Sequence, residues 1–209
     1  MAADSEQHGP GAEPQARGAR MAWVAIAGAA IFILVGIVFA SRFGSDPTLS
    51  SSPLIGEAAP TGEMALQYED GTVSVADHAG DIVVVNFWAS WCLACRQEHA
   101  ALVAGAEDYS ELGTTFIAVN YQDSASNADG FLAELGVSDA TVYALDEGSA
   151  TAFEWGVLGL PETFFVDRSG IVVGKVSGPV SYALLSRTLD QIILGETIGE
   201  ISTGEIENR

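Results

Sequence analysis

Residues 81–95, DIVVVNFWASWCLAC, decide the fold of this chain. Residues 81–88 form a continuous run of mainly β-branched and aromatic side chains, which is typical of a strand buried on both faces in a parallel-type central sheet. Two cysteines separated by two residues follow, and residues 93–108 have the composition of a helix. The segment therefore predicts a buried strand that leads through a Cys-x-x-Cys turn into a helix.

The position of Cys92 and Cys95 between strand and helix favours redox chemistry. The thiolate is the nucleophile in disulfide exchange, and the unpaired N–H groups and positive dipole end of a helix start stabilise it. We expect Cys92, nearer the strand, to be the attacking thiol and Cys95 to resolve the mixed disulfide. A purely structural disulfide is the alternative, but so short a loop adds little stability.

The cysteine and histidine content argues against several other kinds of site. Two cysteines are too few for a disulfide-stapled scaffold or a four-cysteine zinc site. His8, His78 and His99 show no metal-ligand spacing, so no metal is expected. Arg96 follows Cys95 where a c-type haem attachment motif needs histidine. The redox-active Cys92–Cys95 disulfide is thus the sole expected cofactor.

The net charge of −20 lies entirely on residues 43–209, because acidic and basic residues balance in the first 42. Phosphate backbones would repel such a domain, which excludes nucleic acid as a partner, and anionic lipid head groups would not attract it. The simplest interpretation is solubility or a salty habitat. The other interpretation is an electrostatic field that selects basic partners.

Residues 21–40, MAWVAIAGAAIFILVGIVFA, contain no charge and predict a transmembrane anchor. As a helix they would be roughly 30 Å long, which matches the hydrocarbon core of a bilayer. Arg17 and Arg20 precede the run and favour a cytoplasmic N-terminus. A cleaved signal peptide is the alternative, although the run exceeds the usual signal core of about 7–15 residues. Either interpretation places the main domain outside the cytoplasm.

The flanking segments differ in composition. Residues 1–20, rich in Gly, Ala, Pro and Gln, predict a disordered cytoplasmic tail, and residues 41–60, rich in Ser, Pro and Gly, a flexible linker. The folded domain is expected at 61–195, followed by a frayed acidic tail at 196–209.

Within the domain, strands and helices alternate, which predicts an α/β fold with a sheet largely covered by helices. Residues 69–71 form a turn signal between two short strands, and 168–170 a second hairpin turn. The other expected elements are strands at 64–68, 72–75, 114–120, 141–145, 163–167 and 171–177, and helices at 125–135, 149–155 and 182–194.

Several separated motifs carry a family resemblance. Residues 83–95 resemble the active-site segment of the thioredoxin superfamily. Residues 96–99 (RQEH), 156–164 (GVLGLPETF) and 120–121 (NY) are similar to CcmG/DsbE-type proteins of cytochrome c maturation and, more broadly, to the ResA/TlpA group. The resemblance spans roughly residues 54–190. It implies a thioredoxin-like fold with an N-terminal strand extension and an internal βα-type insertion, preceded by one transmembrane helix.

The resemblance also implies a substrate-binding surface. Pro161 matches the cis-proline of the superfamily, which lies beside the Cys-x-x-Cys motif. A cis bond would present the backbone of Leu160 to a substrate segment near Cys92. Trp91 is expected to line the same surface.

Two glutamates match acidic positions of the family. The buried aspartate of thioredoxins is replaced by Asn86, which cannot accept a proton. Glu98 matches the active-site glutamate three residues after Cys95, on the same helix face, where a carboxyl group could relay protons. Glu162 matches a further acidic position and would raise the thiol pKa values if charged and close to them. By composition alone, either glutamate could instead be a solvated surface residue.

The resemblance implies a membrane-anchored reductant, single-pass, with its domain on the periplasmic side. It would reduce the haem-binding cysteines of apocytochrome c and receive electrons from a CcdA/DsbD-like membrane thiol transporter. A general oxidant or isomerase of secreted proteins is one alternative, which a strongly oxidising potential would favour. Residues 93–94, Leu-Ala, lack the proline often found there, so the potential cannot be carried over from the family. A non-catalytic tethered scaffold is the other alternative, for which Cys92→Ser would leave function intact.

Overall fold

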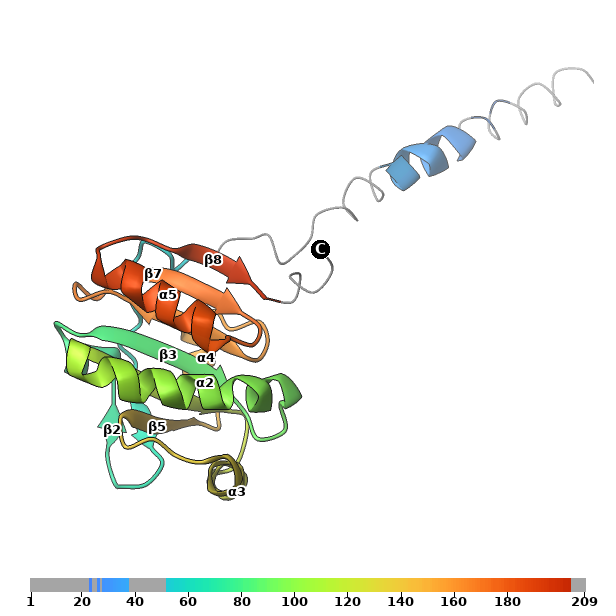
Figure 1. Cartoon of the computed structure of the whole chain (residues 1–209). Coiled ribbons are helices and arrows are strands. Elements are labelled where there is room, and N and C mark those ends of the chain that lie inside the picture. Colours follow the sequence, from blue (N-terminus) through green and yellow to red (C-terminus); the bar gives the residue numbers. More distant parts are fainter. Residues whose placement is uncertain (1–22, 24–25, 27, 38–51, 204–209) are drawn as a thin grey trace, which may run out of the picture. The chain divides into compact units, whose positions relative to one another are not determined.

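The computed structural model describes Trp23, Ile26, residues 28–37 and residues 52–203. The chain divides into two compact units, residues 1–50 and 51–209. In the first unit the described residues are helical (Figure 1). None of the described helices is both long enough and apolar enough to cross a bilayer. The predicted tail at 1–20, the ends of the predicted anchor and most of the predicted linker lie outside the described residues.

The second unit contains one mixed sheet of eight strands in its described part, in the order β2-β1-β5-β4-β3-β6-β7-β8. β3 lies in its interior, parallel to β4 and antiparallel to β6. The strands are β1 (Met64–Leu66), β2 (Thr72–Val73), β3 (Ile82–Trp88), β4 (Thr114–Tyr121), β5 (Thr141–Asp146), β6 (Glu162–Val166), β7 (Val172–Ser177) and β8 (Gly199–Ser202).

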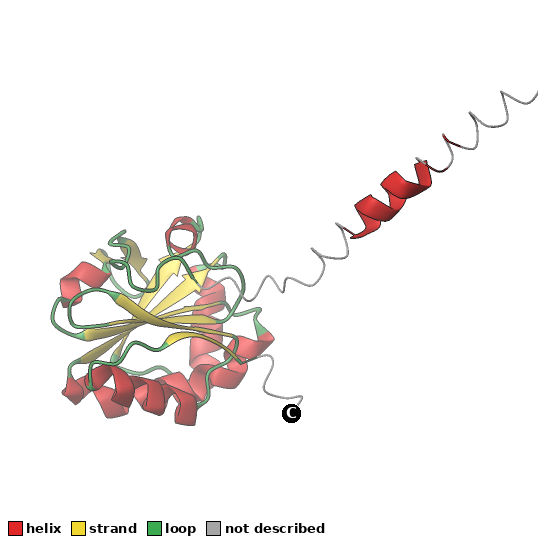
Figure 2. Cartoon of the chain, turned by 90° about the horizontal axis from the view of Figure 1, so that it is seen from above, coloured by secondary structure: helices red, strands yellow, loops and turns green. Residues whose placement is uncertain are grey.

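Helices lie on both sides of this sheet (Figure 2). They are α2 (Leu93–Tyr109), α3 (Ala125–Leu135), α4 (Ala150–Glu154) and α5 (Tyr182–Ile193), with short 3₁₀ turns η2 (Val75–His78) and η3 (Ser110–Leu112). The parallel strands need these helices as crossover connections, which is why both sheet faces are covered.

All seven residues of β3 are buried, as its β-branched and aromatic run predicts. Alternate side chains enter two core layers. Val83, Val85 and Phe87 pack with Trp155 on one face. On the other face Val84 belongs to a layer that includes residues of α2 and α5. The strand ends at Trp88, four residues before Cys92, and the Trp88 side chain packs in a third cluster that contains both cysteines.

The thioredoxin-like α/β fold is confirmed, with a β1–β2 hairpin before β3 and the β5–α4 unit between α3 and β6. Two boundary predictions are wrong. Part of the expected linker packs on the domain: the Gly56 N–H donates to the Val172 carbonyl at 2.8 Å, and Ala58 forms a bridge with Ile171. The apolar Leu54 packs against the core. The Ser- and Pro-rich composition around Leu54 gives no sign of this contact.

The acidic tail is likewise not frayed throughout. β8 pairs in parallel with β7, from Gly174 to Ser177. Ile198 and Ile201 pack against the core layer beneath α5 and hold the strand in place. The acidic composition of this segment gave no sign of these two apolar contacts, and their i to i+3 spacing does not match the period-two pattern of a strand.

Candidate active site

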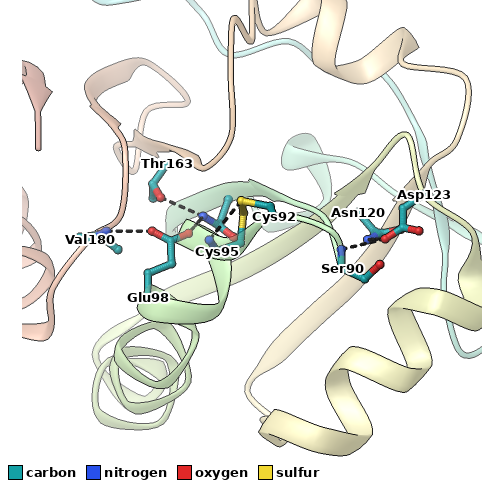
Figure 3. The surroundings of a disulfide bond; sticks show 9 residues. Ser90, Cys92, Cys95, Glu98, Asn120, Asp123, Thr163 and Val180 are labelled. Atoms are coloured by element: carbon teal, nitrogen blue, oxygen red, sulfur yellow. Dashed lines mark hydrogen bonds between the residues drawn. A yellow bond between two sulfur atoms is a disulfide. The ribbon is translucent and has the colours of Figure 1, made fainter. Parts of the chain in front are cut away.

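The helix α2 begins next to the cysteines (Figure 3). Cys92 is its N-cap residue, and the Cys92 sulfur accepts a hydrogen bond from the Cys95 N–H at 3.1 Å. The two cysteines form a disulfide. In the reduced state the same N–H and the positive dipole end would stabilise a Cys92 thiolate. This geometry supports the assignment of Cys92 as the attacking thiol.

The side chains packed in the cluster around the disulfide are mostly apolar. Both cysteines belong to a packed cluster with Trp88 and Phe131, and Leu160 packs against that cluster. The Leu160–Pro161 bond is cis, as predicted. The loop before Pro161 therefore lies beside the disulfide, as a substrate-binding role requires.

The two tryptophans before the cysteines differ in exposure. The Trp88 ring is buried and packs on Phe131 at 4.7 Å between centroids. The Trp91 side chain is 60% exposed, and its indole N–H donates to the Gln122 carbonyl at 3.4 Å. Trp91 is thus available to a partner at the surface, whereas Trp88 is a packing residue.

Glu98 is 1% exposed, so its interpretation as a solvated residue is wrong. Its Oε1 accepts a hydrogen bond from Asn86 Nδ2 at 2.8 Å, and its Oε2 accepts one from the Val180 N–H at 2.8 Å. Asn86 Nδ2 also donates to Thr163 Oγ1 at 3.0 Å. One buried network therefore joins α2, β3, β6 and the segment before α5 beneath the disulfide (Figure 3).

Burial raises the pKa of Glu98 to about 7, against the opposing effect of the hydrogen bonds from Val180 and Asn86. A carboxyl group with such a pKa exchanges protons readily at neutral pH. Glu98 lies one helical turn after Cys95 on the same face of α2. The arrangement places a proton acceptor one helical turn from Cys95, whose thiol must lose its proton to resolve a mixed disulfide.

The structure does not bring Glu162 into this network. Adjacent strand residues point to opposite sheet faces, and Thr163 takes the face of Asn86 and Glu98. The Glu162 side chain is buried on the other face, where its Oε1 lies 3.0 Å from Lys175 Nζ. Burial raises the pKa of Glu162 above its ordinary value, although the contact with Lys175 opposes this shift.

Sequence reasoning missed Asp123, which fixes the approach to Cys92. Its Oδ2 accepts hydrogen bonds from the Ser90 N–H at 2.8 Å and from Asn120 Nδ2 at 3.4 Å. Its Oδ1 accepts from the Ser124 N–H and from Asn127 Nδ2. Although burial raises the pKa of Asp123, these hydrogen bonds, beginning with those from Ser90, lower it below its ordinary value.

A signal for Asp123 was present in the chain. β3 and β4 are parallel neighbours, so their carboxyl ends lie at the same sheet edge. A polar Asn120-x-x-Asp123 pair just after β4 is therefore expected near the residues that follow β3.

In the part of the chain that the structure describes, no three His, Cys, Asp or Glu side chains gather as metal ligands.

Residues 55–175 match the model of the AhpC/TSA family. The chain is 34% identical over 169 residues to the thiol:disulfide interchange protein HelX of Rhodobacter capsulatus, covering 79% of this chain and 93% of the relative. It is 32% identical to DsbE of Pseudomonas fluorescens biotype C, covering 76% and 86%. The crystal structure of a DsbE-type thiol:disulfide interchange protein from Chlorobium tepidum superposes with a TM-score of 0.59 at 30% identity. That match covers 68% of this chain and 96% of the other.

Proposed function

We propose that this chain, which belongs to the AhpC/TSA family and is a thiol:disulfide oxidoreductase of the DsbE and HelX type, reduces the haem-binding cysteines of apocytochrome c during cytochrome c maturation. The single observation that carries the proposal is that Cys92 caps the helix in which the Glu98 carboxyl group is buried, one turn after Cys95. This arrangement suits a dithiol that must deliver two electrons and release two protons near neutral pH.

The reaction begins from the reduced protein. The Cys92 thiolate attacks one sulfur of the client disulfide, so that a Cys92–client bond forms and the client disulfide breaks, releasing one client thiolate. Cys95 then loses its proton to Glu98 and attacks the Cys92 sulfur. The mixed disulfide breaks, the second client thiolate leaves, and Cys92–Cys95 becomes the disulfide seen in the structure. The client gains two electrons and the protein loses two.

A client chain would lie along the Leu160–Pro161 segment. Its backbone would pair with Leu160, beside the sulfur atoms, as an added strand does. The exposed Trp91 ring would contact the client on the other side. We keep Glu162 out of this contact surface, because its carboxylate is occupied by Lys175.

We further propose that residues 21–40 anchor the protein in the cell membrane, with the domain on the periplasmic side. Twenty uncharged residues preceded by Arg17 and Arg20 support this orientation. There a CcdA/DsbD-like membrane thiol transporter would return two electrons to the Cys92–Cys95 disulfide.

A trapping experiment tests the proposed client. In the full-length Cys95→Ser variant the mixed disulfide cannot be resolved, so apocytochrome c with an oxidised haem motif should remain bound through Cys92. The matched control is Cys92→Ser, which should trap nothing. Capture of varied secreted proteins without preference for haem-motif cysteines would contradict the apocytochrome role and favour a general oxidant or isomerase.

A further inference from the structure

The single lysine of the chain, Lys175, lies in the interior of the domain rather than on its surface. Its side chain is 3% exposed. A buried ammonium group is costly unless it is paired. Lys175 Nζ lies 3.0 Å from Glu162 Oε1, 3.9 Å from Glu200 Oε1 and 5.2 Å from the centre of the Phe164 ring. The charge is thus paired twice and covered by an aromatic face.

Glu162 connects this lysine to the loop of residues 156–161, named here the Pro161 loop. Glu162 directly follows Pro161 and begins β6. Its Oε1 contacts Lys175, and its Oε2 accepts a hydrogen bond from the Leu158 N–H at 3.4 Å. One carboxylate therefore joins β7 to the backbone of the loop.

The same cluster reaches two segments far apart in the sequence. Glu200 of β8 accepts a hydrogen bond from the Ser52 N–H at 2.8 Å through its Oε2. Ser177 Oγ lies 3.5 Å from Glu162 Oε1 and 3.4 Å from Glu200 Oε1. Glu200, on the edge strand β8, is therefore the second carboxylate that contacts Lys175.

The Pro161 loop borders the redox pair, because Leu160 packs against the cluster that contains both cysteines. The Pro161 carbonyl accepts a hydrogen bond from the Gly178 N–H at 2.9 Å, so the loop is tied to the end of β7 as well. A shift of the loop would move the surface that a client must contact. It would leave the Cys92 N-cap contact, which belongs to α2, in place.

We propose that Lys175 is a positioning residue of the exchange reaction. Acting through Glu162, it sets the position of the Pro161 loop for a protein client. In this account Glu162 is an anchor of the loop and does not influence the thiols directly. The inference rests on the thiol–disulfide exchange activity and not on the identity of the client.

The test compares full-length variants in detergent, kept reduced by dithiothreitol, with two clients: an oxidised Cys-x-x-Cys-His peptide and insulin. Lys175→Met should raise KM for both clients about tenfold, while kcat changes little. The rate with a small aromatic disulfide reagent and the pKa of the Cys92 thiol should stay unchanged, because neither depends on the loop. Amide exchange at Leu158 should accelerate. Lys175→Arg should bring KM most of the way back to the wild-type value, because it keeps the cation.

Glu162→Gln serves if Lys175→Met folds poorly, and it should raise KM in the same way. Asp190→Asn is the matched control, since it alters a carboxylate bonded to Tyr109 OH at 2.8 Å between α2 and α5. An unchanged KM in both Lys175→Met and Glu162→Gln would overturn the proposal. It would also be overturned if the rate with the small reagent fell by as much as KM rose, or if the pKa of the Cys92 thiol shifted. If the wild type reduced insulin but not the peptide, that result would count against the apocytochrome role. The KM for insulin would still test the position of the loop.

Discussion

The Glu98 carboxylate receives hydrogen bonds from the Asn86 side chain and the Val180 backbone, yet burial raises its pKa to about 7. The desolvation cost of the charge exceeds the help of two donors. Asn86 matters here because an amide can donate to Glu98 without adding a second negative charge. An aspartate at position 86 would place two carboxyl groups in one buried site and separate their pKa values further.

Glu98→Gln should slow the resolution of the mixed disulfide on the order of 100-fold at pH 8, because the proton acceptor for Cys95 is lost. Above pH 7 wild-type Glu98 is charged and accepts the proton, so the wild-type rate should rise through an inflection near 7. The variant should lack that inflection. Stopped-flow measurement of client-thiol release at pH 5–9 gives the resolution rate of both proteins.

The control for this prediction is Glu107→Gln, an exposed position on the same helix. It should leave the pH profile unchanged. A Glu98→Gln profile that overlays the wild type would show that another group takes the proton.

Single residues were predictable where chemistry constrains them locally. Cys92, Cys95 and the cis bond at Pro161 follow from short motifs, and Glu98 is buried on α2 together with Cys95, as the i to i+3 spacing implies. The partners of these residues were not predictable. Val180 is 82 residues from Glu98 in sequence, and its contribution is a backbone N–H, which no side-chain pattern reveals.

At the scale of elements, the turn between β3 and α2 depends on a loop from a neighbouring strand. Asp123, just after β4, accepts a hydrogen bond from the N–H of Ser90, which lies two residues before Cys92. Its remaining hydrogen bonds come from Asn120, Ser124 and Asn127. The carboxylate thereby fixes two adjacent chain segments at the sheet edge that carries the cysteines.

Asp123→Ala should destabilise the domain by about 1–3 kcal/mol at pH 7, because it leaves these donors without their acceptor. The pKa of Asp123 is lowered in the folded state, so its contribution is present above the ordinary value of 3.8 and is lost as the pH falls through the folded value. Urea unfolding at pH 7 and pH 3 measures both effects. Asp139→Ala, at an exposed position, should change little; an equal loss there would contradict the account.

Close packing of α2 against α5 depends on a glycine. A Cβ atom at Gly105 would lie 2.5 Å from Leu185 Cδ2 and 3.5 Å from Phe116 Cζ. Both of these side chains are buried and have little room to move. Gly105 is therefore unfavourable for helix propensity but allows the two helices to pack closely.

Gly105→Ala should lower the free energy of unfolding by about 1–3 kcal/mol, since overpacking outweighs the better propensity. Gly130→Ala is the matched control on α3, where nothing lies within 4 Å of the new Cβ. It should stabilise the domain by about 0.5–1 kcal/mol. Thermal unfolding of the pair decides the matter, and stabilisation by both substitutions would contradict close packing at Gly105.

Most elements were predictable because their hydrophobic runs are strong and their turn residues mark the boundaries. The failures lie at the chain ends of the domain. Residues 52–60 and β8 are held by a few apolar side chains and by pairing with β7 and its preceding residues, and such pairing has no local signal. Composition alone therefore predicted a linker and a frayed tail.

At the scale of the whole molecule, the charge is divided unevenly. All of the net charge of −20 falls on residues 43–209, and the uncharged run at 21–40 precedes that acidic part. An acidic domain is well suited to basic clients, whose approach it would accelerate at low salt. The proposed membrane orientation predicts which cysteines a membrane-impermeant reagent can reach.

In intact cells, a membrane-impermeant maleimide should label reduced Cys92 of the full-length chain. An Ala3→Cys variant that lacks both native cysteines should be labelled only after permeabilisation, because residue 3 is expected in the cytoplasm. The opposite pattern would place the domain inside the cell and remove the proposed electron source.

The most direct test of the central claim is one turnover between the reduced full-length chain and an equimolar oxidised Cys-x-x-Cys-His peptide, quenched with an alkylating agent and read by mass spectrometry. We expect the peptide to carry two alkyl groups and the protein to carry none, because its Cys92–Cys95 disulfide has formed. A peptide that remains oxidised beside a doubly alkylated protein would contradict the account.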